Sequence, residues 1–419
     1  MDVLALIIVA PLLLSLVNFL TPYKEGKAAR RVTFVASVLV LGGAAHLLYS
    51  QPESWQLVFP PHFPVVLQRF SPFLLFSTQG FSGMMMFLFA VLMTVLAFFA
   101  LAGNSRTLRG NHFFAWFWFT AGLGLALFSA SHFYLMIFLW GVSAIPLFML
   151  ASGFGEARAD LGKKTLILFG GAYVLMVTGA VMAVSLSGSA EIATMQTATS
   201  SVQGKVSLLL LLAGGLAATG IIPLHAWIHP YAKYADGWSF ALMPLVFQRL
   251  AGTYLLIRLS QDVFVVGETL RIILFALGIL SSLFALATGI AFAHPASRLA
   301  YFHVALGGMA LAGIATVTQA GALISVLLVT AGAAAMMPFF LIRRQKGSRS
   351  VSLKWLPPAG QRLLAALNRL GATPYADIYE LGSKAVFAMH RQLSRMHDGV
   401  LQTYLVWVVV AMIVLFLLK

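Results

Sequence analysis

The chain contains no cysteine and very little charge. Of its 419 residues, 12 are Asp or Glu and 27 are Lys or Arg, and charged residues make up 9% of the sequence. The absence of cysteine excludes disulfides, zinc–thiolate sites and cysteine-ligated iron–sulfur clusters. The sequence also has no phosphate-binding loop, no histidine and carboxylate cluster with metal-ligand spacing, and no nucleophile motif in a large loop. We therefore expect no cofactor, metal or catalytic site in this chain.

The composition describes a membrane protein and not a set of soluble domains. Hydrophobic residues make up 60% of the chain, and its mean hydropathy is +0.92. The 36 glycines and 33 phenylalanines agree with this class, because small residues let spanning helices approach closely while large apolar side chains face lipid. The sequence therefore predicts an all-α polytopic membrane protein.

Apolar runs long enough to cross about 30 Å of hydrocarbon, roughly 20 residues each, recur along the chain. Asp2 precedes the first run and no basic segment does, so we interpret that run as a retained span and not as a signal peptide. We expect about twelve transmembrane helices, at residues 2–20, 31–50, 73–102, 112–130, 132–153, 164–187, 206–229, 238–258, 269–293, 299–318, 320–342 and 400–418.

The basic residues indicate the orientation of these spans. The formal net charge is +15, but most Lys and Arg side chains lie in short loops between apolar runs, so we expect no nucleic-acid partner. With the N-terminus outside, basic loops such as residues 24–31 and 343–354 fall on the cytoplasmic side. We therefore expect both termini outside, in the cytoplasmic membrane of a bacterium or an archaeon.

The stretch from Arg343 to Gly399 differs in character from the spans. Between Pro374 and His397, apolar residues recur every three or four positions, with basic residues on the opposite face. This pattern predicts an amphipathic helix on the cytoplasmic surface before the last span. An ordinary solvated connector is the alternative.

Two spans contain a proline deep inside, Pro223 and Pro338. Proline removes a backbone hydrogen bond and clashes with the preceding turn, and in lipid the freed carbonyl must find another partner. We expect a broken helix at each position, as in transporters built from internal repeats. A tolerated kink is the alternative at either site.

No carboxylate is expected at mid-membrane, although a proton or cation pump normally needs an intramembrane group that binds and releases charge. His225 and His303 can exchange protons near neutral pH and are candidates for a relay, or they are hydrogen-bonding residues at helix ends. Arg249 stays protonated, so it biases a neighbouring group, holds an oxygen atom or anchors a helix or subunit. All twelve acidic residues lie in loops, at span ends or in the surface segment: Asp2, Glu25, Glu53, Glu156, Asp160, Glu191, Asp236, Asp262, Glu268, Asp377, Glu380 and Asp398.

The order of several motifs resembles the antiporter-like membrane subunits of respiratory complex I, membrane-bound hydrogenases of the formate hydrogenlyase type and Mrp antiporters. The segment Pro223-Leu224-His225-Ala226-Trp227 is similar to that family's proline-aromatic-histidine-x-tryptophan element at a broken seventh helix. Trp140 to Phe148, Ser297 to Gly308 and His397 to Leu418 resemble further family elements. The resemblance implies N-terminal spans (1–110), a first antiporter-like helix unit (111–260), a shortened second unit (261–343), a connector with the surface helix (344–399) and a C-terminal span (400–419).

The chain departs from this family at its charge relay. The resemblance implies a fifth-helix glutamate and lysines on the sixth, seventh, eighth and twelfth helices. Gly141 occupies the glutamate position, and Ala218 the seventh-helix lysine position. Lys164 matches the sixth-helix lysine. At the eighth helix the expected lysine position reads Leu250, with Arg249 beside it. Around Pro338, a run of alanines stands where the twelfth-helix lysine is expected. The resemblance thus implies a divergent and shortened member.

We favour a non-redox membrane subunit of a complex I-like or hydrogenase-like complex, with an antiporter-like scaffold and a degraded proton relay. Its expected partners are other membrane subunits, lipids and a cytoplasmic-side redox or catalytic subunit, so the chain would belong to an oxidoreductase complex. One alternative is a proton or sodium translocating subunit that uses Lys164, His225, His303 and water. The other is a membrane subunit of an ion-coupled inorganic carbon uptake complex.

Overall fold

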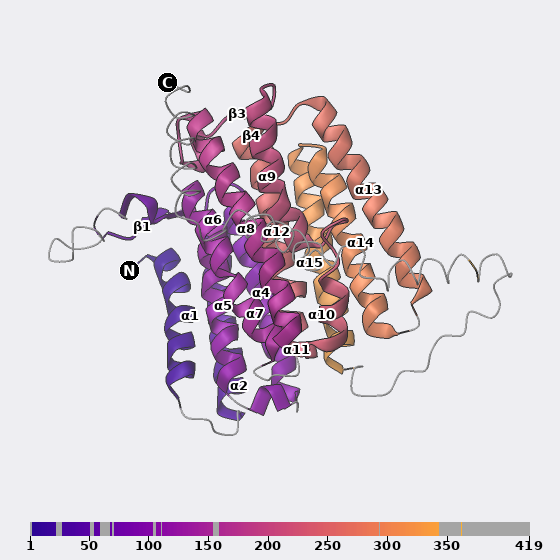
Figure 1. The fold of residues 1–419 in the computed structure, drawn as a ribbon. Helices are drawn as coiled ribbons and strands as arrows, with labels where there is room; N and C mark the ends of the chain where they lie inside the picture. The colour runs from indigo at the N-terminus through magenta and orange to yellow at the C-terminus, as the bar shows by residue number, and fades with distance from the viewer. Residues whose placement is uncertain are drawn as a thin grey trace, which may run out of the picture. The chain divides into compact units, whose positions relative to one another are not determined.

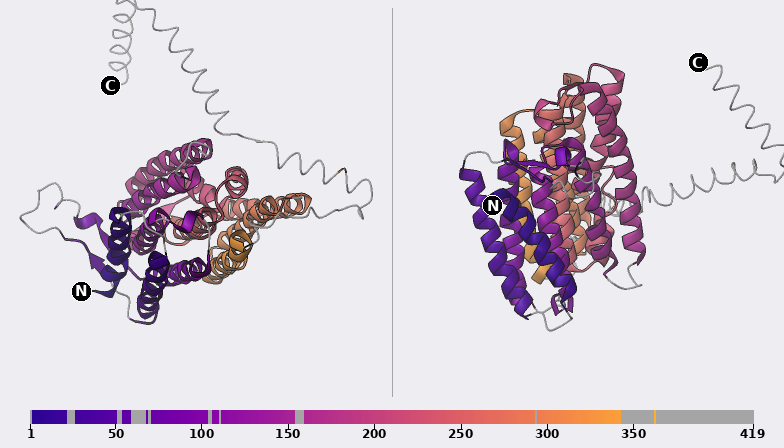
Figure 2. Two further views of the ribbon diagram at one scale, coloured as in Figure 1. Left: turned by 90° about the horizontal axis from the view of Figure 1, so that it is seen from below. Right: turned by 90° about the vertical axis from the view of Figure 1, so that its left-hand side faces the viewer.

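The described part of the chain is a bundle of membrane-spanning helices (Figures 1 and 2). The structure is a computed structural model that describes residues 2–21, 27–50, 54–58, 68, 71–103, 106–109, 111–153, 159–292, 294–342 and 362. All of them belong to one compact unit, Met1–Thr373. The unit boundaries expected near residues 110 and 260 stay predictions.

Eleven helical segments in the described ranges are long and apolar enough to cross a membrane. They confirm eleven of the twelve expected spans, whereas the span at 400–418 and the surface helix at 374–397 lie outside the described residues. The segments are α1 (Val3–Leu20), α2 (Lys27–Tyr49), α4 (Phe81–Ala102), α5 (Asn111–Ser129), α6 and α7 (Phe133–Val142, Ala144–Ser152), α8 (Ala159–Ser187), α9 (Val202–Thr219), α11 to η6 (Gly237–Val263), α13 (Glu268–Ala291), α14 (Pro295–Ala315) and α15 (Gln319–Ile342).

The third span is shorter than its apolar run. We expected a helix from residue 73, but α4 begins at Phe81, after Gly80 with a φ of 61°. The preceding residues form a 3-10 turn, η1 (Ser71–Phe73), and strand β2 (Leu75–Ser77), which pairs antiparallel with β1 (Ser54–Gln56). Leu75 and Phe76 thus contribute apolar residues to the run without belonging to the helix.

The remaining short elements lie between the spans. A two-residue strand, β3 (Thr197–Ala198), pairs in parallel with β4 (Phe264–Val265). The short helices outside the spans are η2 (Arg106–Arg109), η4 (Ile192–Thr194) and α10 (Ile228–Tyr234).

The two expected proline breaks have different outcomes. Helix α9 ends at Thr219, Gly220 follows with a φ of 70°, and a series of turns around Pro223 leads into α10. In contrast, α15 continues through Pro338 to Ile342, so the break expected there is absent. Pro338 lies in the last turn and a half of α15, where the loss of one backbone hydrogen bond disturbs little of the helix.

Two irregularities that we did not expect lie in the middle of spans. A turn at Ser143 separates α6 from α7. The eighth span begins with α11 (Gly237–Phe240), continues as a π-helix, η5 (Ala241–Gln248), and returns to α-helix in α12 (Arg249–Arg258). Pro244 lies inside η5. A proline has no N–H to donate, which favours such a change in hydrogen-bond pattern.

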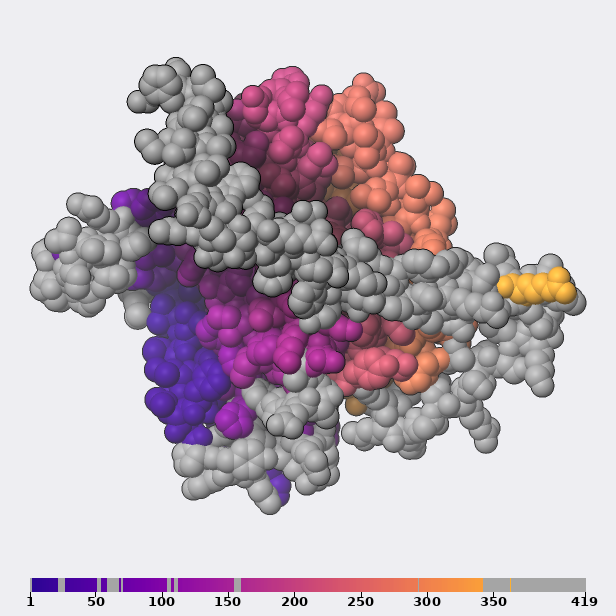
Figure 3. Space-filling model, in the orientation of Figure 1, coloured from indigo at the N-terminus to yellow at the C-terminus, as the bar shows by residue number. Residues whose placement is uncertain are grey.

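The eighth span forms the core of the bundle. Its residues 237–257 are all buried, whereas at most a third of the spanning windows of α1, α2, α8 and α13 is buried. In Figure 1, α1 lies at the left edge and α13 at the right, with α12 between them. The space-filling view shows α13 at the right-hand rim (Figure 3). Since exposed residues such as Ile272 and Leu280 are apolar, these outer helices face lipid or other membrane helices.

Glycines bring α13 and α14 into backbone contact. A Cβ atom placed at Gly278 would lie 2.6 Å from the carbonyl oxygen of Gly308, and a Cβ at Gly308 would lie 2.6 Å from that of Gly278. Both distances are shorter than a normal carbon–oxygen contact, so neither position accepts a side chain without moving a helix. Small residues at such crossings are how membrane helices gain close packing.

We expect Gly278→Ala to destabilise the chain by about 1–3 kcal/mol, because overpacking forces the backbones apart. The matched control is Gly170→Ala in α8, where nothing lies within 4 Å of the added Cβ atom. Alanine there should be neutral or slightly stabilising, since it is a better helix former. Thermal unfolding in detergent measures both, and equal melting temperatures for the two variants would contradict the close contact.

Candidate functional site

A buried polar cluster lies where the irregular spans meet. Ser143, between α6 and α7, accepts a hydrogen bond from Nε2 of Gln248 at 3.2 Å. The next residue, Arg249, donates from Nε to Nε2 of His303 in α14 at 3.3 Å, and its Nη2 donates to the His303 carbonyl oxygen. All four residues are 1% exposed or less. We call Ser143, Gln248, Arg249 and His303 the central polar cluster.

The π-helical turn positions two members of this cluster. Gln248 ends η5 and Arg249 begins α12, so both stand at the junction between the two helix types. A π-turn inserts an extra residue into the helical repeat, which changes the directions of the side chains that follow it. Gln248 thereby reaches α6 and α7, while Arg249 reaches α14. Thr253 then closes the first turn of α12 by donating to the Arg249 carbonyl at 2.8 Å.

The arginine of this cluster is buried without a carboxylate partner among the described residues. His303 contributes a ring nitrogen and a carbonyl oxygen, both neutral acceptors. Nη1 of Arg249 and Nδ1 of His303 are buried and have no hydrogen-bond partner in the described part of the chain. A buried cation held only by neutral groups makes the centre of the bundle electropositive.

The structure brings together only two of the four residues expected in a relay. Arg249 contacts His303, whereas Lys164 is exposed on α8. His225 lies in the turns after α9, with its ring beside Phe284 and Tyr301 at centroid distances of 6.5 and 6.0 Å. Among the described residues, no hydrogen bond or ring contact joins His225 to the central polar cluster.

Gly141 and Ala218, which we expected at the family's glutamate and seventh-helix lysine positions, are both closely packed. A side chain at Gly141 would overlap the ring of Tyr173, which reaches across from α8. Ala218 is fully buried, and a Cβ atom at Gly252 in α12 would lie 2.8 Å from its Cβ atom. Neither position has room for a long ionisable side chain without displacement of its neighbour.

A second polar network, absent from our sequence analysis, joins α12 to α4 and α5. Arg258 donates to Oδ2 of Asp262 at 2.7 Å, to the Tyr254 hydroxyl at 2.8 Å and to the Ser82 hydroxyl at 2.7 Å. Tyr254 in turn donates to the Phe128 carbonyl oxygen at 2.8 Å. The i,i+4 spacing of Arg258 and Asp262 was the available signal for this ion pair.

His229 is a partly buried histidine that our sequence analysis did not select. Its Nε2 lies 2.9 Å from the Ser297 hydroxyl, and its ring stacks on Phe292 at a centroid distance of 5.1 Å. Burial lowers the pKa of His229 to about 4, and positive charge on Lys233, His294 and His225 adds to this effect. His229 is therefore neutral at pH 7.

We expect the chain to lose stability as the pH falls from about 6.5 to about 4. In the unfolded chain a histidine takes up its proton near pH 6.5, but His229 in the folded chain resists protonation until about pH 4. Acid therefore favours the unfolded state within this range. Melting temperatures measured from pH 4 to 7 should fall less steeply for His229→Asn than for the unchanged chain. The control is His46→Asn at an exposed position on α2, and parallel pH profiles for the unchanged chain and His229→Asn would contradict the expectation.

Curated proteins similar to this chain are subunits of quinone oxidoreductases. An NAD(P)H-quinone oxidoreductase chain 4 from Trichormus variabilis is 27% identical over 349 residues, which are 81% of this chain and 64% of the relative. One from Nostoc sp. is also 27% identical, over 81% of this chain and 63% of the relative. The chain thus spans less than two thirds of the length of these relatives.

Solved structures share the fold. The Mrp complex from Dietzia sp. matches with a TM-score of 0.69 and 16% identity, over 84% of this chain and 39% of that chain. Respiratory complex I from Thermus thermophilus matches with a TM-score of 0.67 and 18% identity, over 88% of this chain and 83% of that chain. An archaeal membrane-bound sulfane sulfur reductase matches with a TM-score of 0.65 and 16% identity, over 83% of this chain and 58% of that chain.

The family resemblance is confirmed by a match to a family model. Residues 130–354 match the model described as NADH:quinone oxidoreductase/Mrp antiporter, transmembrane. This segment includes Gly141, the broken helix around Pro223 and the central polar cluster. Since the match covers more than half of the sequence, the chain belongs to the transmembrane family of NADH:quinone oxidoreductases and Mrp antiporters.

Proposed function

We propose that this chain is a non-redox membrane subunit of a complex I-like or hydrogenase-like energy-converting complex, in which packing replaces the proton relay. The observation that carries the proposal is the overlap between Tyr173 and any side chain at Gly141. The contact of Ala218 with Gly252 supports it at a second position. The scaffold of the family is kept, while the space that its ionisable groups would need is occupied.

The central polar cluster acts as a brace in this proposal. Its hydrogen bonds tie the α6–α7 turn to the eighth span, and the eighth span to α14. The positive charge of Arg249 also opposes the entry of cations, because a fixed charge of the same sign in a low-dielectric interior is a strong electrostatic barrier. In this proposal the central polar cluster therefore stabilises the bundle and also blocks the passage of cations through its centre.

The chain would assemble with other membrane subunits and with a cytoplasmic-side redox or catalytic subunit, surrounded by lipid. The absence of cysteine from the sequence supports a partner that holds the redox centres. We place the complex in the cytoplasmic membrane of a bacterium or an archaeon, with the termini of this chain outside. Residues 374–397 would form the surface helix that contacts neighbouring subunits.

A proton or sodium translocating subunit of the antiporter type is the second candidate. Four buried atoms without a hydrogen-bond partner in the described part of the chain favour it, namely Arg249 Nη1, His303 Nδ1, Gln248 Oε1 and Trp140 Nε1. Such atoms are able to bind water along a proton path. A membrane subunit of an ion-coupled inorganic carbon uptake complex is a third possibility within the same family. The chains that co-purify in mild detergent distinguish these functions, since iron–sulfur and dehydrogenase subunits would favour the first.

The purified chain in liposomes should pass protons and sodium ions at a rate close to that of empty vesicles. The reason is that the relay positions are filled and Arg249 repels cations. A pH-sensitive dye inside the vesicles and a sodium-sensitive dye measure the two fluxes after a gradient is imposed. Robust flux that disappears in a His225→Ala variant would defeat the proposal and support a translocating subunit.

Gly141→Glu, which restores the family carboxylate, should destabilise the chain mainly through Tyr173. In a Tyr173→Ala background the ring is absent. The loss of stability caused by Gly141→Glu should then be smaller by about 1–3 kcal/mol, the usual size of an overpacking penalty. A double-mutant cycle of melting temperatures isolates this coupling. An equal loss of stability in both backgrounds would mean that the ring does not fill this position.

A further inference from the structure

The chain between the broken helix α9 and the eighth span forms a separate unit, residues 220–235, which we call the strap. It begins at Gly220, with a φ of 70°, and its second half is α10. It ends where the Asp236 carboxylate accepts hydrogen bonds from the N–H groups of Trp238 and Ser239 at 3.0 and 3.2 Å. In Figure 1, α10 lies beside α11 in the lower half of the view. A left-handed glycine at one end and a capped helix start at the other give the strap two defined points about which it can turn.

Trp227 ties the strap back to the helix from which it departs. Its Nε1 donates to the Ala217 carbonyl oxygen in the last turn of α9 at 2.9 Å. The same carbonyl accepts the Gly220 N–H at 3.2 Å, so the indole uses its second lone pair. The Trp227 ring also packs edge-on against Phe169 and Tyr231, at centroid distances of 5.1 and 5.9 Å. The end of a broken helix leaves carbonyl groups that need donors inside a membrane protein, and this side chain supplies one.

Two further polar contacts join the strap to its neighbours. The Ile222 N–H donates to the Ser281 hydroxyl of α13 at 3.1 Å. His229 Nε2 lies 2.9 Å from the Ser297 hydroxyl of α14. Each of these contacts is a single hydrogen bond between uncharged groups or through one ring nitrogen, and such bonds contribute only about 0.5–1.5 kcal/mol each.

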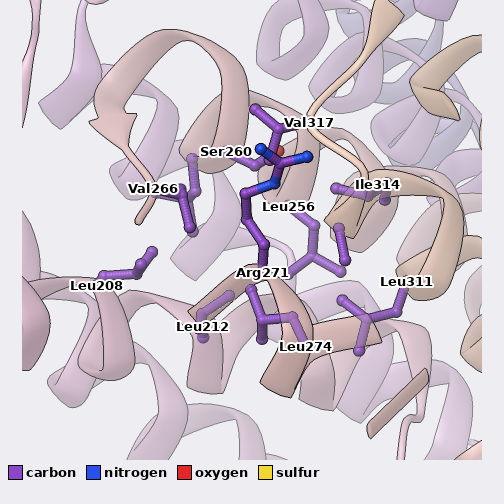
Figure 4. A pocket seen from close by; sticks show the side chains of 12 residues that line it. Leu208, Leu212, Leu256, Ser260, Val266, Arg271, Leu274, Leu311, Ile314 and Val317 are labelled. Carbon is purple, nitrogen blue, oxygen red and sulfur yellow. The ribbon is translucent and has the colours of Figure 1, made fainter. Parts of the chain in front are cut away.

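The two helices that receive these contacts are held firmly against each other. They touch at Gly278 and Gly308, where an added Cβ atom would lie 2.6 Å from the opposite carbonyl oxygen. At the other end of α13, Arg271 donates to the Thr316 carbonyl after α14 at 2.8 Å, and leucines lie along the stem of its side chain (Figure 4). The strap is therefore better able to move than the helices beneath it.

A row of aromatic rings leads from the strap to the central polar cluster. Tyr231 of α10 lies 6.1 Å from Phe240 of α11 between ring centroids, and Phe240 lies 6.1 Å from His303. All three side chains are fully buried. The Tyr231 hydroxyl, Arg249 Nη1 and His303 Nδ1 have no hydrogen-bond partner among the described residues. Buried polar atoms of this kind favour a state in which water reaches them.

We propose that the strap is a hinged lid that controls the access of water to the central polar cluster, with the Trp227–Ala217 hydrogen bond as its latch. The structure is the closed state, in which Tyr231 and Phe240 separate the cluster from this end of the bundle. Opening breaks the latch and hydrates the Tyr231 hydroxyl and then the cluster. The charge of Arg249 stays in place in both states, so the lid does not depend on whether the chain translocates ions.

Cysteine labelling measures the opening of the strap, because the chain has no cysteine of its own. Ala232→Cys places the only thiol at a fully buried position of α10, and Lys233→Cys places it at the exposed neighbouring position. A water-soluble maleimide should label Ala232→Cys more slowly than Lys233→Cys by about tenfold or more, since only the open state reacts. Trp227→Phe removes the indole N–H and keeps an aromatic ring. It should raise the labelling rate of Ala232→Cys about three- to tenfold, the change expected for the loss of one hydrogen bond.

Trp118→Phe is the matched control for the latch. The buried Trp118 indole also donates one hydrogen bond, to the Thr33 hydroxyl at 3.2 Å, outside the strap and its contacts. This variant should leave the labelling rate of Ala232→Cys unchanged. Ser281→Ala removes a different contact of the strap and should raise the rate in the same direction as Trp227→Phe, so the test does not rest on one variant.

Two measurements separate opening of the strap from general unfolding. The fully buried Ala97→Cys in α4 should stay protected from the maleimide when Trp227 is replaced by Phe. Hydrogen exchange of the backbone amides of residues 237–248 should be faster in Trp227→Phe than in the unchanged chain, because water then reaches the eighth span. Equal labelling rates for Trp227→Phe and Trp118→Phe, no effect of Ser281→Ala, unchanged exchange at 237–248, or loss of protection at Ala97→Cys would each overturn the proposal. Labelling of Ala232→Cys as fast as Lys233→Cys in the otherwise unchanged chain would do the same.

Discussion

The contact between Arg249 and His303 governs the interior of this bundle. A guanidinium in a low-dielectric interior normally requires a carboxylate, yet here an imidazole nitrogen and a backbone carbonyl take its place among the described residues. Both acceptors belong to one residue of α14, so the position of that helix is tied to the start of α12. The Gln248–Ser143 bond satisfies one further buried polar group beside this contact.

Neutral side chains pack closely around Gly141 and Ala218. Tyr173 occupies the space beside Gly141, and Gly252 lies against Ala218, so neutral contacts stand at two positions where the resemblance led us to expect ionisable groups. An empty space at either position would leave its lining without contacts, which is costly in a packed interior. The ring of Tyr173 and the close approach of α12 to Ala218 leave no such space. A bundle of this kind keeps the family's helix arrangement while its electrostatics differ.

Hydropathy was sufficient to predict eleven spans, because each span is a continuous apolar run of membrane-crossing length. The start of the third span was misplaced, since Leu75 and Phe76 of β2 extend the apolar run that the helix continues. The intact helix at Pro338 and the π-turn at Pro244 show that a proline alone does not specify its local outcome. Arg249 and His303 were both selected, but their contact joins residues 54 positions apart, and a single sequence carries no record of such a pairing.

The glycine crossing at Gly278 and Gly308 has a mechanical consequence. Helices whose backbones touch have no layer of flexible side chains to deform between them, so α13 and α14 cannot slide along each other by small rotamer changes. They form a stiff hairpin that tilts or rotates as a whole. A displacement of one end of α13 is therefore expected to move α14 with it.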